Sequence, residues 1–196
     1  MRASHRFQAL AASALLAVMA LLLVGFRLGR TGLWTDESIY AQTAREMARS
    51  GDWITPTLCG RPYLIKPPLY HWLAASAFHL LGENELAARL PQALFGIAAI
   101  LSVGWLATGL FPKKSGWLAG AALLTSPGFL IAARVAGMDV LLLLCITLSL
   151  ISFFKGYRRS AARRPWFLGS GLFAGLGMLA KGPLGLFIPA MVILLF

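Results

Sequence analysis

Acidic and basic side chains that could act on a substrate are concentrated in one polar stretch of an otherwise apolar chain. Six of the seven acidic residues lie between Asp36 and Glu85, and Asp139 is the only acid outside that range. A carboxylate such as Asp36 or its neighbour Glu37 can act as a base toward a hydroxyl group. An isolated ionisable residue between apolar runs, such as Asp139, is a functional candidate by default. The candidate catalytic residues are therefore Asp36, Glu37 and Asp139.

A second candidate group surrounds the sequence Lys66-Pro67-Pro68. Proline is tolerated in the first turn of a helix, so the motif predicts Lys66 just ahead of a helix N-terminus. Free N–H groups and the helix dipole favour an anion there, which makes the motif suitable for a phosphate. Tyr63 and Arg61 are close in the sequence and could donate further hydrogen bonds. The alternative is a lysine whose ammonium meets lipid phosphates nonspecifically.

Several of these candidates also have a purely structural interpretation. Asp36 or Thr35 could cap the helix predicted to follow them. Asp139 could form an ion pair with Arg134 and close a turn at the end of an apolar run. Lys181, in a Lys-Gly-Pro sequence, is either a turn residue or a second cation that faces the site.

The composition predicts a polytopic, all-α membrane protein. Of 196 residues, 58% are hydrophobic and 13% are charged, a balance too apolar for a soluble domain of this size. We expect about six membrane spans, in the apolar runs 7–28, 90–111, 116–133, 140–154, 166–180 and from 183 onward. Because the chain stops inside an apolar run, the sequence also looks like a fragment or a truncated reading frame.

The net charge of +11 comes from short basic clusters between the apolar runs, which is typical of topology signals and not of nucleic-acid binding. Three clusters are predicted on the cytoplasmic side, and they comprise Arg2 with Arg6, Lys113 with Lys114, and Lys155 with Arg158, Arg159, Arg163 and Arg164. Residues 30–89 then form one large non-cytoplasmic loop with two interfacial helices, since the run 69–81 is short and follows two prolines. The turns at 134–139 and 181–184 fall on the same side, so the candidates converge on one membrane face. Arg89 lies on that side against the charge rule.

No metal site is predicted from the two cysteines or the three histidines, because none has a partner at ligand spacing. A divalent cation could be gathered by Asp36, Glu37 and Asp139, although no ligand spacing requires one. Pairs of glycines four residues apart, at 116–120 and 171–175, predict closely packed helices.

The polar motifs together resemble a known family. In order, the chain carries WTDESIYAQTAREMARSGDW, GRPYLIKPPLYHW, GENELAARLP, an Asp after the third span, and LAKGPLGL. This series resembles, from about residue 30 onward, the N-terminal part of the polyprenyl-phosphate-dependent glycosyltransferases of the protein O-mannosyltransferase superfamily. Among these, the bacterial lipid A aminoarabinose transferases are the most similar.

The resemblance implies the N-terminal portion of a C-type glycosyltransferase fold, with its active site at the periplasmic face of the inner membrane. It implies sugar transfer from a polyprenyl-phosphate donor to a lipid A-like lipid or to a protein, at a hydroxyl or phosphate. Carried over to matching positions, it implies that Asp36 faces the acceptor and Asp139 is a second acid. It also implies that Lys66 and Tyr63 lie near the carrier phosphate.

Two positions depart from the aminoarabinose transferases. Those enzymes typically have Arg and Glu where this chain has Ile39 and Ile65. The departures put aminoarabinose and lipid A in doubt as donor sugar and acceptor, but leave the transfer from a lipid phosphate unaffected. We expect direct displacement at the anomeric carbon, which inverts its configuration.

Two other functions are compatible with the sequence. A transporter or flippase for lipid-linked sugars would use the isolated acid as a proton relay or binding site, and would show two related halves with broken spans. The sequence contains no such repeat. The second alternative is an inactive remnant that inserts into the membrane and retains only part of the site.

Overall fold

The computed structural model describes residues 2–112, 114–158 and 163–196. Lys113 and Arg159, which belong to the predicted cytoplasmic clusters, lie outside these ranges. The elements are α1 (Arg2–Gly25), α2 (Thr35–Ser50), β1 (Thr57–Leu58), β2 (Arg61–Pro62), α3 (Leu69–Leu81), α4 (Glu85–Leu110), α5 (Lys114–Thr125), α6 (Pro127–Arg134), α7 (Asp139–Arg158), α8 (Arg163–Lys181) and α9 (Leu184–Leu195). The all-α prediction is thus confirmed except for one short antiparallel hairpin.

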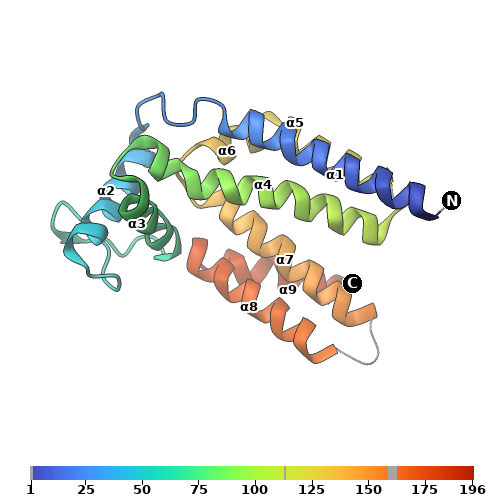
Figure 1. Ribbon diagram of the computed structural model, residues 1–196. Coiled ribbons are helices and arrows are strands. Elements are labelled where there is room, and N and C mark those ends of the chain that lie inside the picture. The colour runs from blue at the N-terminus through green and yellow to red at the C-terminus, as the bar shows by residue number, and fades with distance from the viewer. Residues whose placement is uncertain (1, 113, 159–162) are drawn as a thin grey trace.

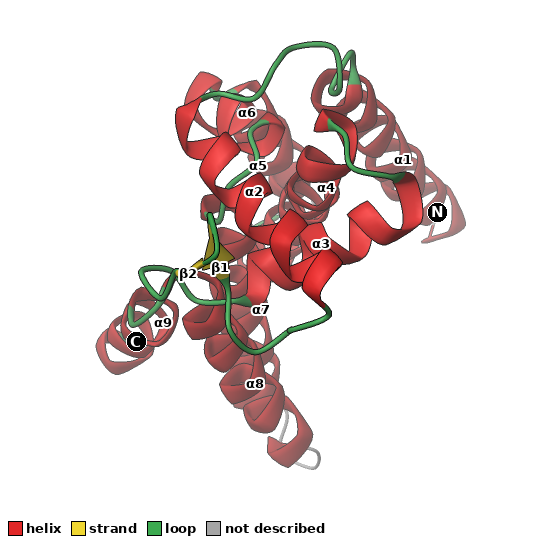
Figure 2. Ribbon diagram, turned by 90° about the vertical axis from the view of Figure 1, so that its left-hand side faces the viewer, coloured by secondary structure: helices red, strands yellow, loops and turns green. Residues whose placement is uncertain are grey.

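The long helices run side by side as a bundle, and α2, α3 and the hairpin cover one end of it (Figure 1 and Figure 2). The bundle core contains apolar side chains of α1, α4, α5 and α7, such as Leu16, Ile100, Leu124 and Val140. A second core joins α2 and α3 to the start of α4. The polar segment between α1 and α4 therefore forms a packed layer on the bundle.

The predicted apolar runs coincide with helices, but only some of these helices meet the length and hydropathy of a span. Among the described residues, α4 and α7 qualify by length and composition. The bent pair α5 and α6 would count as a third span if taken together, while α9 and the apolar part of α1 are shorter. The six predicted spans thus remain a prediction.

The run 116–133, which is predicted as a single span, is divided between two helices. The helix breaks between Thr125 and Pro127, and its two parts are bent by 69°. Pro127 has no N–H to continue the hydrogen-bond ladder, so it starts a new helix instead. The break turns α6 toward the end of the bundle that carries α2 and α3 (Figure 2).

The two helices of the polar segment begin and end largely where the sequence places their signals. α3 begins directly after Pro67-Pro68, which confirms the position predicted for Lys66. α2 ends at Gly51, whose φ of 72° is a left-handed conformation that glycine adopts readily. The cap of α2 is Trp34, and neither Thr35 nor Asp36 fills that role, because the first helical residue is already Thr35.

One of the two predicted glycine pairs packs closely. A Cβ on Gly116 would collide with the Thr108 side chain and with the Gly104 carbonyl of α4, and one on Gly120 would meet Leu16 of α1. Glycines at 171 and 175 have open space around them within the described residues. Small residues therefore bring α4 and α5 together, while α8 gains no such contact from its own pair.

Candidate functional site

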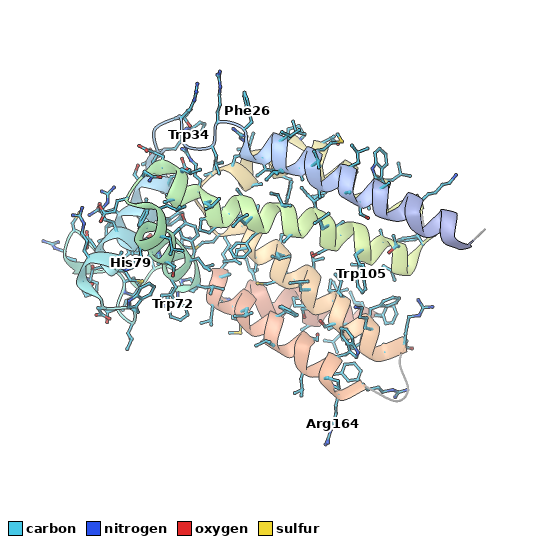
Figure 3. All side chains as sticks on the ribbon, viewed as in Figure 1. Phe26, Trp34, Trp72, His79, Trp105 and Arg164 are labelled. Carbon is cyan, nitrogen blue, oxygen red and sulfur yellow. The ribbon has the colours of Figure 1, made fainter. Side chains whose placement is uncertain are left out.

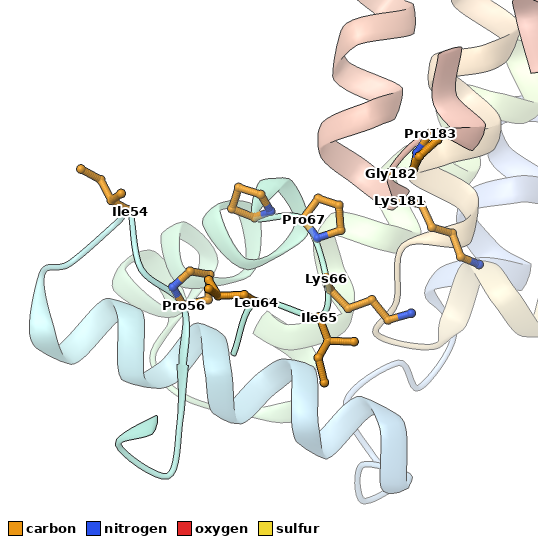
Figure 4. Close-up of a pocket in the computed structure, with 10 residues that line it drawn as sticks. Ile54, Pro56, Leu64, Ile65, Lys66, Pro67, Lys181, Gly182 and Pro183 are labelled. Carbon is orange, nitrogen blue, oxygen red and sulfur yellow. The ribbon is translucent and has the colours of Figure 1, made fainter. Parts of the chain in front are cut away.

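Lys66 and Lys181 line the same pocket at the end of the bundle. The pocket has a volume of about 500 Å³, and the other residues around it are Ile54, Pro56, Leu64, Ile65, Pro67, Pro68, Gly182 and Pro183. One wall is the loop between the hairpin and α3, and the other is the turn between α8 and α9. Figure 4 shows both lysine side chains extending into the space between these walls. Two positive charges in one concave site suit a phosphate group.

Asp139 forms an ion pair with Lys181. Asp139 is the first residue of α7 and Lys181 is the last of α8, so the pair joins the ends of two neighbouring helices. The Asp139 side chain is 65% exposed, which leaves most of the carboxylate accessible. The structure therefore places the isolated acid and a second cation of the pocket in direct contact.

The alternative pairing of Asp139 with Arg134 was wrong. Arg134 donates hydrogen bonds to the carbonyl oxygens of Leu23, Val24 and Phe26, at 2.6, 3.0 and 2.6 Å. These carbonyls lie at the C-terminal end of α1, where backbone acceptors lack helical partners. The Arg134 guanidinium thus closes the end of a helix, and this geometry does not support the substrate-binding role predicted for it.

Glu37 is buried in an ion pair and is turned away from solvent, with an exposure of 0%. Arg89 donates from Nε to Oε1 at 2.8 Å and from Nη2 to Oε2 at 2.7 Å. The backbone N–H groups of Trp34 and Ala136 bind the same carboxylate at 3.0 and 2.6 Å. Burial favours the protonated form, but these hydrogen bonds outweigh it and hold the pKa of Glu37 below its usual value. With both oxygens occupied, the geometry does not support the catalytic role predicted for Glu37.

Arg89, the cation predicted on the outer side against the charge rule, has a structural role. Besides Glu37, it donates to the backbone carbonyls of Leu28, Thr31 and Gly32 at 2.9, 2.8 and 2.9 Å. The Arg89 side chain is 3% exposed. Its hydrogen bonds hold the segment between α1 and α2 against the start of α4. Sequence analysis noted this residue as an exception without assigning it a role.

Glu46 fixes the hairpin that precedes Lys66. Its carboxylate accepts hydrogen bonds from Thr57 Oγ1 at 2.8 Å and from the N–H groups of Cys59 and Gly60 at 2.7 and 3.2 Å. Burial would raise the pKa of Glu46, but the hydrogen bonds from Gln42, Thr57 and the hairpin backbone lower it to about 2. The turn of the hairpin is therefore held against α2 by an ionised carboxylate.

The remaining predicted residues differ in their surroundings. Asp36 is exposed in the first turn of α2, and Arg61 is exposed on β2. Tyr63 is half-buried, and its N–H donates to the Pro56 carbonyl at 2.8 Å. Its ring packs edge-on against His71, with 6.3 Å between ring centres.

Two residues that the sequence analysis did not select lie among these candidates. Burial first, and then the nearby Tyr63, Asp36 and Asp139, raise the pKa of Tyr40, so Tyr40 senses both acids. Tyr40 follows Asp36 by four residues, a spacing that puts the two side chains on the same face of a helix. That spacing is a sequence signal by which Tyr40 could have been selected as a candidate. His71 is fully buried and contacts the ring of Tyr40.

The carboxylates do not gather into a metal site. Within the described ranges there is no group of three His, Cys, Asp or Glu side chains that could hold an ion. Glu37 is bound by Arg89 and Asp139 by Lys181, so the three acids considered for a divalent cation do not converge. The residues present therefore give no fit for such an ion.

Comparison with known proteins gives the family. The family model described as dolichyl-phosphate-mannose-protein mannosyltransferase matches residues 65–196. The chain belongs to this family. The expected relationship to polyprenyl-phosphate glycosyltransferases is thus confirmed. The matched part of the chain includes Lys66, Asp139 and Lys181.

Relatives within this group are about one third identical to the chain over the aligned region. The undecaprenyl phosphate-alpha-4-amino-4-deoxy-L-arabinose arabinosyl transferase of Pseudomonas savastanoi pv. phaseolicola is 34% identical over 186 residues, which cover 92% of this chain and 34% of that protein. The chain thus spans about a third of the length of this relative.

Solved structures support the same fold. The crystal structure of ArnT from Cupriavidus metallidurans in the apo state has a TM-score of 0.83 and 29% identity, and the match covers 98% of this chain and 36% of that one. The structure of ArnT bound to undecaprenyl phosphate has a TM-score of 0.80 and 28% identity, covering 100% and 36%. The family's helical membrane fold is therefore shared, over the part that this chain represents.

Proposed function

We propose that this chain forms part of a glycosyltransferase that moves a sugar from a polyprenyl-phosphate carrier to an acceptor at the periplasmic face of the inner membrane. The observation that carries the proposal is the pocket that Lys66 and Lys181 share, with Asp139 bound to Lys181. A relative of the same fold has been solved with undecaprenyl phosphate. A pocket with two cations and apolar walls suits the phosphate of such a lipid.

In this proposal, Lys66 and Lys181 hold the carrier phosphate. The bond between the anomeric carbon and the phosphate oxygen breaks, and the negative charge that the carrier phosphate gains is stabilised by the two ammonium groups. A preorganised cation in a partly dry site stabilises such a charge by several kcal/mol. Asp139 acts through its ion pair by keeping Lys181 directed at the site. Tyr63 and Arg61 stay candidates for further contacts with the donor.

Asp36 is proposed to face the acceptor. It accepts the proton of an acceptor hydroxyl as the oxygen attacks the anomeric carbon, and direct displacement then inverts the configuration. A phosphate acceptor would attack without needing this base. The exposure of Asp36 at the start of α2 and its proximity to Tyr40 support this assignment.

Glu37 is proposed to position the acids without touching the substrate. It is adjacent to Asp36, and its Oε1 accepts from Ala136, three residues before Asp139. The buried Glu37–Arg89 pair thereby connects the two acidic segments. The acceptor is proposed to be a lipid A-like lipid or a protein, as the sequence resemblance implies. The name of the relative specifies the carrier and the sugar of the donor only.

Transfer of a labelled sugar from a polyprenyl-phosphate donor, measured in membranes that contain the protein, tests the proposal. Asp36→Asn should lower the rate by about 10² to 10⁴, while membrane insertion is unchanged. Asp52→Asn is the matched control, because Asp52 is an exposed acid of the same segment whose Oδ1 caps a local turn. We expect that control to retain the wild-type rate.

Two results would contradict this mechanism. A wild-type rate for Asp36→Asn would remove Asp36 from the reaction, and a product with retained configuration would exclude direct displacement. Donor binding without any transfer to an acceptor would favour the transporter or the inactive remnant instead.

A further inference from the structure

A groove runs between α4 and α7 at the end of the bundle away from the candidate site. One part of it, about 370 Å³ in volume, is lined by Leu101, Ser102, Trp105, Leu148, Ile151 and Lys155. A second part, about 260 Å³ in volume, is lined by Trp105, Leu106, Gly109, Phe154, Lys155 and Arg158. Because Trp105 and Lys155 line both parts, the two hollows adjoin, and we call them together the α4–α7 groove. In Figure 3, Trp105 and Arg164 lie at the opposite end of the molecule from Trp72 and His79.

Two cations are fixed in this groove, with Lys155 where the two parts adjoin and Arg158 in the outer part. The Lys155 ammonium lies 3.9 Å from the ring centre of Trp105 and 4.4 Å from that of Trp166. Arg158 donates from Nη1 to the Gly109 carbonyl at 3.1 Å, and its guanidinium lies 5.3 Å from the Phe154 ring centre. Cation–π contacts of this kind orient a positive charge without neutralising it. The groove therefore ends in an ordered positive site.

Basic residues are concentrated at this end of the bundle. Lys114, Lys155, Arg158, Arg163 and Arg164 lie at the start of α5, the end of α7 and the start of α8. Apart from Asp139, at the opposite end of α7, the sequence has no acidic residue before position 36 or after position 85. An anionic ligand would thus meet a net positive potential at this end.

The inner part of the groove is apolar. Leu101 and Gly109 mark its extent on α4, and eight residues of helix correspond to about 12 Å. Leu148 and Ile151 line the facing side on α7. A ligand that fills the groove needs an apolar segment of this order and a negative head group at one end. A free phosphate would occupy only the outer end.

We propose that the α4–α7 groove binds one anionic phospholipid from the membrane leaflet opposite the sugar-transfer site. Its phosphate contacts Lys155 and Arg158, and an acyl chain lies along Leu101, Leu148 and Ile151. Basic pockets between membrane helices on the cytoplasmic side commonly receive anionic lipid head groups. The predicted topology places this end of the bundle on that side.

Native mass spectrometry of the purified protein in detergent tests this proposal. The protein is titrated with phosphatidylglycerol and, separately, with phosphatidylcholine of the same acyl chains. We expect one phosphatidylglycerol per chain to be retained at lipid concentrations where phosphatidylcholine is not. The double variant Lys155→Ala/Arg158→Ala should bind phosphatidylglycerol about 30-fold more weakly, from about fivefold per cation near a membrane surface.

Matched variants separate a built site from general attraction. Arg164→Ala removes one charge from the same end of the bundle but lines neither part of the groove, so it should keep wild-type binding. Ser102→Trp fills the inner part while leaving both cations in place, so it should weaken binding without changing the charge. Lys155→Arg/Arg158→Lys preserves both charges, should retain binding, and shows whether the alanine variant is impaired only by misfolding.

Several outcomes would overturn the proposal. Equal retention of the two lipids, or equal losses in Arg164→Ala and the double alanine variant, would mean diffuse attraction. Wild-type binding by Ser102→Trp would remove the acyl chain from the groove. Competition by millimolar glycerol phosphate as effective as that by phosphatidylglycerol would mean that the outer end is a site for free phosphates.

Discussion

Glu37 and Arg89 form a buried ion pair with two hydrogen bonds, and this pair joins three separate segments of the chain. Glu37 belongs to the first turn of α2, and Arg89 to the second turn of α4. Through the N–H of Ala136 the pair also holds the segment that leads into α7. The relative positions of the two exposed acids, Asp36 and Asp139, therefore depend on the Glu37–Arg89 pair, although neither acid takes part in it.

Breaking this pair should destabilise the fold. In Glu37→Gln, Arg89 would remain buried without a counter-charge, and the loss of one partner of such a pair costs about 3–5 kcal/mol. Thermal unfolding in detergent measures the effect. Arg49→Ala is the matched control, because its ion pair with Glu83 is solvent-exposed and contributes little to stability. If Glu37→Gln unfolds like the control, the pair does not hold the site together.

The two pocket lysines should affect the use of the donor. Lys66→Ala and Lys181→Ala are each expected to raise the KM for the polyprenyl-phosphate sugar and to lower kcat, because both charges are proposed to contact the phosphate. Arg30→Ala, which removes an exposed cation between α1 and α2, should change neither parameter. Unchanged donor affinity and rate in Lys66→Ala would return that residue to nonspecific contact with lipid head groups.

Asp139 and Lys181 should not act independently. Asp139→Asn releases the Lys181 ammonium from its ion pair, so the effects of Asp139→Asn and Lys181→Ala on transfer should be less than additive in the double variant. Rates of the four proteins in the same transfer assay measure this coupling. Full additivity would mean that Asp139 serves the reaction by a route separate from Lys181.

The hairpin ahead of Lys66 should lose order in acid. The pKa of Glu46 is lowered from 4.5 to about 2 in the folded protein, so its stabilisation is present above pH 4.5 and is lost as the pH falls toward 2. Hydrogen-exchange protection of the Cys59 and Gly60 amides should thus be constant from pH 8 to about 5 and then decrease. In Glu46→Gln, protection should be lower throughout and should lack this acid transition. A transition retained in that variant would assign it to another group.

Close packing of α5 on α4 should make one glycine much more sensitive than another. Gly116→Val would force a side chain into the Gly104 carbonyl and Thr108, and overpacking typically costs about 1–3 kcal/mol. Gly171→Val adds the same side chain where a Cβ has open space and should change stability far less. Equal unfolding temperatures for the two variants would contradict the packing observed here.

Local signals in the sequence were sufficient to predict where most of the helices lie. Apolar runs coincide with helices because their lengths and composition favour helical segments regardless of their neighbours. The prolines before α3 and Gly51 after α2 mark helix boundaries through their own backbone restrictions. The break at Pro127 has the same kind of cause, but a single long apolar run concealed it.

The ordered motifs were also sufficient to identify the family, because residue types and their order can be read from the sequence without knowing any tertiary contact. The pocket could not be derived in this way. Lys66 and Lys181 are far apart in the sequence, and only the packing of α3, α7 and α8 brings them to one space. The ion pair of Lys181 with Asp139 is equally a result of the tertiary structure. Arg134, which is closer to Asp139 in the sequence, binds the end of α1 instead.

Burial decided which acid of an adjacent pair is available for chemistry. From the sequence alone, Asp36 and Glu37 are equally good candidates for a catalytic acid. Successive side chains of a helix, however, point in directions about 100° apart. Glu37 lies on the buried face of α2 and meets Arg89 of α4, while Asp36 stays exposed. The sequence by itself therefore determined the helices, the family and the set of ionisable candidates. Only the tertiary structure separated the residues that can meet a substrate from those that hold the fold, because desolvation and pairing depend on neighbours distant in the chain.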